Sequence, residues 1–352
     1  MTLLEKTIAA IQPLDAAGME AAKGRISSLA KPRGSLGVLE DIAVKLAGIH
    51  GKIPYIGGKV VIIIAGDHGV AEEGVSAYPQ DFTIKMVDTF LKGGAAVNVL
   101  ARHAGAEIVV VDMGVKGSLG NHASLRHSKI KFGTDNMLFK PAMTREEAVR
   151  AVECGIEAAR EEMEKGAGIL ALGEMGIGNT TPSTAILASL AGVPVEGVVG
   201  RGTGIDGEIL EGKCRIINTA IEKHSPDPRD PLDVLAKVGG LEIAGLVGVI
   251  LGSAAKRTPV IMDGFISGAA AMLAAALRPE CRDYIFPSHL SMEPGHGVML
   301  DWLGLKPIIH MDMCLGEGTG AVLALHIIEA AVKIFNEMAT LDELSTCKDP
   351  GC

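Results

Sequence analysis

The sequence predicts an α/β fold built on a mostly parallel sheet. Short β-branched runs recur along the 352 residues, and helical or glycine-rich stretches separate them. Most of these runs are continuously apolar rather than alternating, which is typical of strands buried on both faces. Strands that alternate with helices are joined by crossovers and lie parallel. The 45 glycines and the 48% of hydrophobic residues also fit a tightly packed α/β protein.

Six runs are expected to form strands, and a seventh is a further candidate. The six cover residues 60–65, 108–111, 169–172, 260–262, 284–286 and 308–311, and the candidate covers 130–132. Residues 1–30 and 321–345 instead carry apolar positions at helical spacing. Helices from the two ends of the chain could therefore pack together.

The expected strands end in polar side chains. These are Asp67 and His68, Asp112, Glu174, Asp263, Ser288 and His289, and Asp312. Because parallel strands place their carboxyl ends at one edge of a sheet, we expect a cleft lined by carboxylates there. Turn and cap roles account equally well for about half of these residues.

Residues 174–181, Glu-Met-Gly-Ile-Gly-Asn-Thr-Thr, are the strongest indication of a site. They join an apolar run to the start of a helix, where free backbone N–H groups suit a phosphate. A tight turn capped by Asn179 or Thr180 explains this segment alone equally well. Residues 315–320, Leu-Gly-Glu-Gly-Thr-Gly, repeat the pattern and favour a ligand site.

Residues 202–207 match the dinucleotide pattern G-x-G-x-x-G, but the apolar stretch before them is short and interrupted by Glu196. We expect an anion-binding loop there, with Lys213 nearby. No metal is expected, because the polar residues that could be assembled into a metal site lack ligand spacing. These residues are Asp67, His68, His289, His296, His310 and Asp312.

Composition argues against several partners. The net charge of −9, with no basic stripe, disfavours nucleic acid. The six cysteines are scattered without a C-x-x-C pair, which favours a reducing compartment. The start lacks a signal-peptide pattern, and the apolar stretches at 246–251 and 269–277 are too short for a bilayer. We expect a cytoplasmic protein with no membrane partner.

Seven motifs stand in order between about residue 30 and residue 330: Gly34-Ser-Leu-Gly37, Asp67-His-Gly-Val70, 174–182, Lys237-Val-Gly-Gly240, Asp263-Gly-Phe265, Pro287-Ser-His289 and 315–320. Taken together, they resemble the motifs of nicotinate-nucleotide–dimethylbenzimidazole phosphoribosyltransferases. The resemblance implies a Rossmann-like parallel sheet in a large α/β domain, residues 51–324. It also implies a homodimer and a small helical domain made of residues 1–50 and 325–352.

The resemblance also implies an activity and the residues that perform it. Phosphoribose moves from nicotinate mononucleotide to 5,6-dimethylbenzimidazole, and the products are nicotinate and α-ribazole 5′-phosphate. Glu317, in the Leu-Gly-Glu-Gly motif, is the implied general base. The implied substrate-binding residues are Tyr78, Met86 and Leu315 for the base, Gly176, Asn179, Thr180, Gly202, Lys213 and Ser291 for phosphate and ribose, and Asp263.

This chemistry needs no cofactor and no metal. Nicotinate on the ribose is a pyridinium and leaves as a neutral ring, so no pyrophosphate charge develops. Enzymes that use phosphoribosyl pyrophosphate carry two adjacent acidic residues after the strand, whereas Glu174 stands alone before Met175. Glu317 can take the proton that the benzimidazole loses. A helix start near Gly318 would favour its ionised form, and an apolar pocket its neutral form.

Glu174 is the second catalytic candidate. It could support the ribose hydroxyls or stabilise a developing oxocarbenium charge, and a loop-organising role is an equal alternative. Two other protein classes remain: a nicotinamide-dinucleotide oxidoreductase and a nucleotide binder without catalysis. The first needs a glycine fingerprint after the first strand, where Ala65-Gly-Asp-His-Gly69 stands instead. The second has no need of a base such as Glu317.

Overall fold

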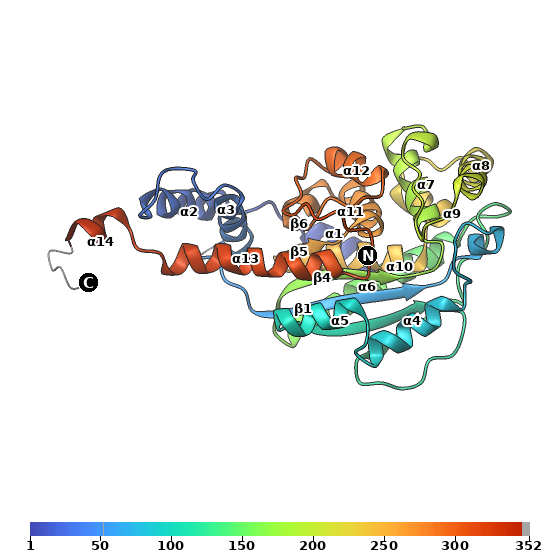
Figure 1. Cartoon of the computed structure of the whole chain (residues 1–352), viewed down its shortest axis with the longest axis horizontal. Helices are drawn as coiled ribbons and strands as arrows, with labels where there is room; N and C mark the ends of the chain where they lie inside the picture. Colours follow the sequence, from blue (N-terminus) through green and yellow to red (C-terminus); the bar gives the residue numbers. More distant parts are fainter. Residues whose placement is uncertain (52, 347–352) are drawn as a thin grey trace.

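The computed structural model, which describes residues 1–51 and 53–346, contains a sheet of six parallel strands (Figure 1). The spatial order is β3-β2-β1-β4-β5-β6. The order reverses between β1 and β4, and ligands of open α/β sheets bind beyond the carboxyl ends at such a point. The strands are β1 (Gly58–Gly66), β2 (Glu107–Gly114), β3 (Leu125–His127), β4 (Ala167–Met175), β5 (Val260–Met262) and β6 (Ile285–Pro287).

Helices cover both faces of the sheet, as the continuously apolar strands predict. Neighbouring side chains on a strand point to opposite faces. Ile64 accordingly lies against Gly245 of α10, whereas Ile63 lies beside Gly173, near the turn that begins α13. Helices α6 and α10 pack together on the first side, and α4, α5 and α13 lie on the other.

The remaining elements connect these layers. The α-helices are α1 (Leu3–Ala10), α2 (Ala16–Ser28), α3 (Val38–His50), α4 (Phe82–Leu91), α5 (Ala96–Ala104), α6 (Arg145–Glu164), α7 (Thr180–Ala191), α8 (Gly207–His224), α9 (Pro231–Val238), α10 (Leu241–Ala255), α11 (Phe265–Leu277), α12 (Gly295–Leu303), α13 (Thr319–Glu337) and α14 (Leu341–Thr346). The 3₁₀ helices are η1 (Gly69–Glu73), η2 (Val195–Gly197) and η3 (Pro279–Tyr284).

Five of the predicted strands are confirmed as β1, β2, β4, β5 and β6, the last displaced by one residue. The prediction for 308–311 is wrong: Ile309 makes only an isolated parallel bridge with His289. Pro307 has no N–H to donate there, and Asp312 turns the chain with a φ of 51°. The candidate 130–132 is also wrong. The short edge strand β3 precedes it, and its single apolar residue, Leu125, gave no recognisable pattern.

The ends of the chain are helical, as predicted, and α2 and α3 lie beside the C-terminal half of α13, away from the sheet (Figure 1). A separate small core joins these three helices, formed by Ala22, Ile26, Ala43, Ala47 and Phe335. Helix α1, in contrast, packs on α6 and α10. The proposed division into 1–50 with 325–352 and 51–324 stays a prediction, and its residues 52 and 347–352 lie outside the described part of the chain.

Among the described residues, one helix, α13, is long and apolar enough to cross a membrane, judged by length and composition alone. Buried core helices pass the same criterion, and 56% of its most apolar window is buried inside the protein. It packs against α3, α5, β4 and β5. Its apolar surface is therefore largely covered by the rest of the chain.

Candidate functional site

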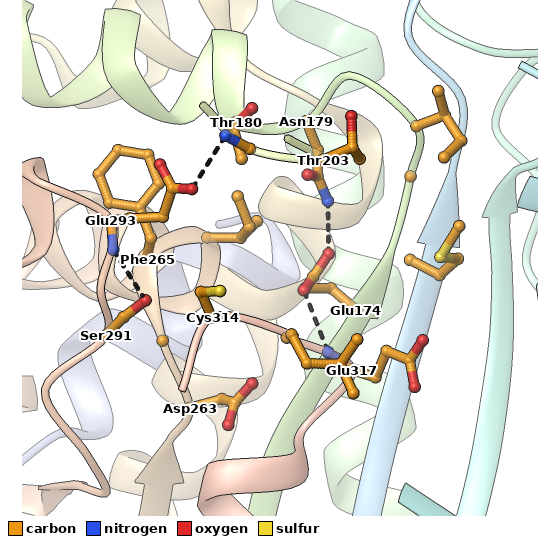
Figure 2. Close-up of a pocket in the computed structure, with 18 of the residues that line it drawn as sticks. Glu174, Asn179, Thr180, Thr203, Asp263, Phe265, Ser291, Glu293, Cys314 and Glu317 are labelled. Atoms are coloured by element: carbon orange, nitrogen blue, oxygen red, sulfur yellow. Dashed lines mark hydrogen bonds between the residues drawn. The ribbon is translucent and has the colours of Figure 1, made fainter. Parts of the chain in front are cut away.

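A cavity of about 620 Å³ opens at the carboxyl ends of β4 and β5, next to the point where the strand order reverses (Figure 2). Loops that follow β1, β4, β5 and β6 contribute its walls, together with the turn before α13. All but one of the predicted site residues line it. They are Tyr78, Met86, Glu174, Gly176, Asn179, Thr180, Gly202, Asp263, Ser291, Leu315 and Glu317.

Lys213 is the predicted site residue that does not line the cavity. It lies on α8, buried behind Thr180, and its Nζ donates to Thr180 Oγ1 at 2.7 Å and to the carbonyl of Gly200 at 3.1 Å. Burial lowers the pKa of Lys213 to about 8, while Glu293 acts in the opposite direction. The ammonium thus lies one side chain behind the wall and orients the Thr180 hydroxyl.

The same end of the cavity carries Glu293, which the sequence did not indicate. Its Oε1 accepts a hydrogen bond of 3.0 Å from the Gly202 N–H, and its own N–H donates to Ser291 Oγ at 3.3 Å. Burial raises the pKa of Glu293, and Lys213 opposes that shift. No motif predicted this carboxyl, because Glu293 does not directly follow a strand and Gly202, which donates to it, lies 91 residues away in the sequence.

A second part of the wall is apolar. Tyr78 and Phe82 stack with their ring centroids 4.8 Å apart, and Met86 lies on the same helix as Phe82. Leu315 comes from the turn before α13 and is 56% exposed. Phe82, Met175 and Ile177 were not among the predicted site residues. Phe82 lies in an amphipathic helix, and Met175 and Ile177 closely follow Glu174. In the sequence, apolar residues at such positions look the same as ordinary core residues.

Glu174 connects the two walls. It ends β4, and its Oε2 accepts a hydrogen bond from the Asn179 amide. Its Oε1 accepts from the Glu317 backbone N–H at 3.4 Å, so the three residues form a connected series in Figure 2. Burial raises the pKa of Glu174 to about 8, and the nearby Glu242 and Asp263 add to the shift. Burial and the two neighbouring carboxyl groups thus favour the protonated form of Glu174.

Glu317 occupies an unusual backbone conformation. Its φ is 63°, and its neighbours Gly316 and Gly318 have φ values of 85° and 92°. A side chain at Gly173 would place a Cβ only 2.6 Å from the Glu317 carbonyl oxygen, so the close approach of this turn to β4 requires a glycine. Left-handed non-glycine residues are uncommon and gather at functional sites.

The Glu317 side chain is 8% exposed and lines the cavity. Within residues 1–51 and 53–346, its carboxyl group makes no hydrogen bond or ion pair of its own. Burial raises its pKa to about 7, with Asp263 contributing. Of the two influences expected from the sequence, burial is the one that raises this pKa, and N–H groups at the start of α13 bond to Asp263 instead of to the Glu317 carboxyl group.

Asp263 receives the N–H groups at the start of α13 instead. Its Oδ2 accepts from Gly318 N at 3.1 Å and its Oδ1 from Ala321 N at 2.9 Å. His289 Nδ1 lies 4.0 Å from Oδ1. Burial raises the pKa of Asp263, while His289 and these N–H groups act in the opposite direction. The predicted substrate-binding carboxylate thus lies in the cavity wall but bonds to the backbone.

Of the other polar strand ends, His289 lines the cavity, whereas Asp67 and His68 make contacts outside its lining. Asp67 accepts from the Lys116 N–H at 2.6 Å, and His68 Nε2 lies 2.7 Å from Glu242 Oε1, both buried behind the cavity. His310 and Asp312 are exposed. In the described part of the chain, no three His, Cys, Asp or Glu side chains are grouped as metal ligands.

Comparisons with known proteins agree with one another. A family model described as Phosphoribosyltransferase matches residues 11–345. The nicotinate-nucleotide–dimethylbenzimidazole phosphoribosyltransferase of Desulforamulus reducens is 54% identical over 99% of this chain and 100% of its own. The Geobacter sulfurreducens enzyme of that name is 52% identical over 97% and 98%. The crystal structure of CobT from Thermus thermophilus gives a TM-score of 0.91 at 45% identity, covering 95% of this chain and 100% of that one.

Proposed function

The chain belongs to the nicotinate-nucleotide–dimethylbenzimidazole phosphoribosyltransferase family, and from this premise we propose how its cavity performs the reaction. The protein is an enzyme that transfers phosphoribose from nicotinate mononucleotide to 5,6-dimethylbenzimidazole, yielding α-ribazole 5′-phosphate and nicotinate. The assignment of individual residues is the proposal.

The observation that carries this proposal is the Glu317 carboxyl group, which has no partner of its own among the described residues and faces a cavity with one polar and one apolar end. The donor phosphate binds at the polar end, near Gly176, Thr180 and Gly202, with Lys213 behind. The Thr180 hydroxyl accepts from Lys213 and can therefore donate its own proton to the phosphate. N–H groups at the start of α7 are further suitable donors. Asn179 and Ser291 face the ribose.

The acceptor base lies at the apolar end, against Tyr78, Met86 and Leu315. Its ring N–H gives its proton to Glu317 as the other ring nitrogen attacks C1 of the ribose. The C–N bond to the pyridinium breaks, nicotinate leaves as a neutral ring, and in-line attack inverts the β-linked donor to an α-linked product. A pKa near 7 suits a general base at neutral pH.

Two broader features are also proposals. Assembly into a homodimer and location in the cytoplasm rest on the family resemblance and on composition. Light scattering, which separates a 36.5 kDa monomer from a dimer, tests the first.

The test of the proposed base is Glu317→Gln, assayed by nicotinate release from nicotinate mononucleotide and dimethylbenzimidazole. General-base assistance typically contributes about 10²–10⁴-fold, so kcat should fall by that factor. In the wild type, kcat/KM should fall as the pH drops below about 7, since the protonated carboxyl cannot accept a proton. Glu337→Gln, an exposed change at the other end of α13, should leave kcat unchanged. Full turnover by Glu317→Gln would refute the assignment.

A further inference from the structure

We propose that Asp263 is a positioning residue of the transfer reaction, which holds Glu317 in its left-handed conformation by binding the start of α13, rather than a residue that binds substrate. This inference rests on the proposed function, because it assigns Asp263 a role that acts through Glu317. It concerns one carboxyl group at the end of β5, only 2% exposed.

Both oxygens of Asp263 are used by the backbone of the turn that carries Glu317. Oδ2 accepts from Gly318 N, the residue directly after Glu317, and Oδ1 accepts from Ala321 N within the first helical turn. Helix N-termini leave these N–H groups without intrahelical partners, so a carboxylate there bonds well. Each oxygen of Asp263 thus already accepts a hydrogen bond from the turn that carries Glu317.

The turn requires such restraint. Three consecutive residues, 316–318, have positive φ values, and Glu317 is the one that is not glycine. L-residues persist in this region only where their surroundings hold them. Glu174 accepts from the Glu317 N–H on one side, Asp263 binds the next N–H on the other, and Thr319 Oγ1 donates to the Gly316 carbonyl at 2.8 Å. Without Asp263, Glu317 can relax and move its carboxyl group from the acceptor base.

Asp263 also acts on Glu317 through its charge, because a second carboxylate nearby disfavours ionisation of Glu317. The titratable groups from the surrounding elements are Glu174 after β4, Asp263 after β5 and His289 after β6, with Cys314 on the loop of Glu317 itself. After burial, Asp263 is the cause that raises the pKa of Glu317. A neutral side chain at position 263 removes this repulsion, so the pKa of Glu317 should fall.

The test is Asp263→Asn, which keeps one acceptor atom and no charge. We expect kcat to fall by about 10–100-fold, the size seen when a catalytic group is slightly misplaced. The KM for nicotinate mononucleotide should stay within about threefold, since no substrate contact is lost. The acid limb of the kcat/KM profile should move to lower pH. Asp15→Asn is the matched control, because Asp15 caps α2 through Gly18 N at 2.8 Å, and its kcat should not change.

Three results would overturn the inference: an unchanged kcat, a loss that appears wholly in the donor KM, or an acid limb that does not move. Thermal unfolding and calorimetric binding of nicotinate mononucleotide establish that the variant is folded. If Asp263→Asn fails to fold, Asp263→Ser, which retains a capping oxygen, is measured against the same outcomes.

A double-variant cycle separates this inference from the proposed function. If Asp263 acts through Glu317, adding Asp263→Asn to Glu317→Gln should lower kcat little further, because residues that act as a unit are not additive. Multiplicative losses would overturn the positioning role while leaving Glu317 as the base. Full turnover by Glu317→Gln alone would instead remove the proposed base.

Discussion

Glu174 and Glu317 are two carboxyl groups in the cavity wall, and their contacts suit them to different roles. Glu317 has a pKa raised to about 7 and an unengaged carboxyl group among the described residues, which suits proton transfer. Glu174 has a pKa raised to about 8, and both of its oxygens bond to neighbours. Different surroundings can in this way assign different roles to like groups. The sequence resemblance implied Glu317 as the general base, and it left Glu174 between a catalytic and a loop-organising role.

Glu174→Gln should therefore retain far more activity than Glu174→Ala. A glutamine at position 174 is neutral, like the protonated acid, and its side-chain oxygen can accept from the Glu317 N–H. Its NH₂ group can donate to the side-chain oxygen of Asn179 once the Asn179 amide has flipped. Alanine loses both bonds, and two such bonds of about 1–2 kcal/mol each correspond to a loss on the order of 100-fold in kcat/KM. Steady-state rates for both variants check this. Equal losses would instead indicate that the charge of Glu174 stabilises the oxocarbenium ion.

Helices and strands could be predicted from the sequence where consecutive residues are buried. The apolar runs of β1 and β4 are buried on both faces, so their composition alone identified them. Edge elements were not: β3 is three residues long, and 308–311 has an apolar start but only one bridge to its neighbour. Pairing at an edge depends on tertiary position, which local composition does not encode.

Two loops at the cavity mouth are joined by one side chain. Thr203 Oγ1 accepts from Ala77 N at 2.9 Å and lies 3.0 Å from Ser76 Oγ, so it connects the Gly202 loop to the loop that carries Tyr78. Thr203→Val should raise the KM for dimethylbenzimidazole about 2–10-fold, the equivalent of a net hydrogen bond, with kcat nearly unchanged. Thr203→Ser, which retains the hydroxyl, should behave as wild type. A rise confined to the donor KM would contradict this coupling of loops.

At the scale of the whole molecule, the alternation of strands and helices predicted one polar edge, and the cavity lies there. Glu174, Asp263 and Glu317 meet because parallel strands bring their carboxyl ends together. The finer arrangement did not follow from pattern: Lys213 lies behind Thr180, and Glu293 binds Gly202, through contacts between segments distant in sequence. These contacts depend on the packing of α8 and the 291–294 loop, which no local spacing specifies.

The carboxyl group of Glu317 should also make stability depend on pH. The pKa of Glu317 is raised from 4.5 to about 7, so folding favours its protonated form. Its favourable contribution is complete below about pH 4.5 and is lost as the pH rises through about 7. Glutamine cannot titrate, so the free energy of unfolding of Glu317→Gln relative to wild type should increase between pH 5 and pH 8, by on the order of 2 kcal/mol. Urea titrations at the two pH values measure it, with Glu337→Gln as the exposed control, and a difference that does not change with pH would mean that the folded protein leaves Glu317 as solvated as the unfolded chain does.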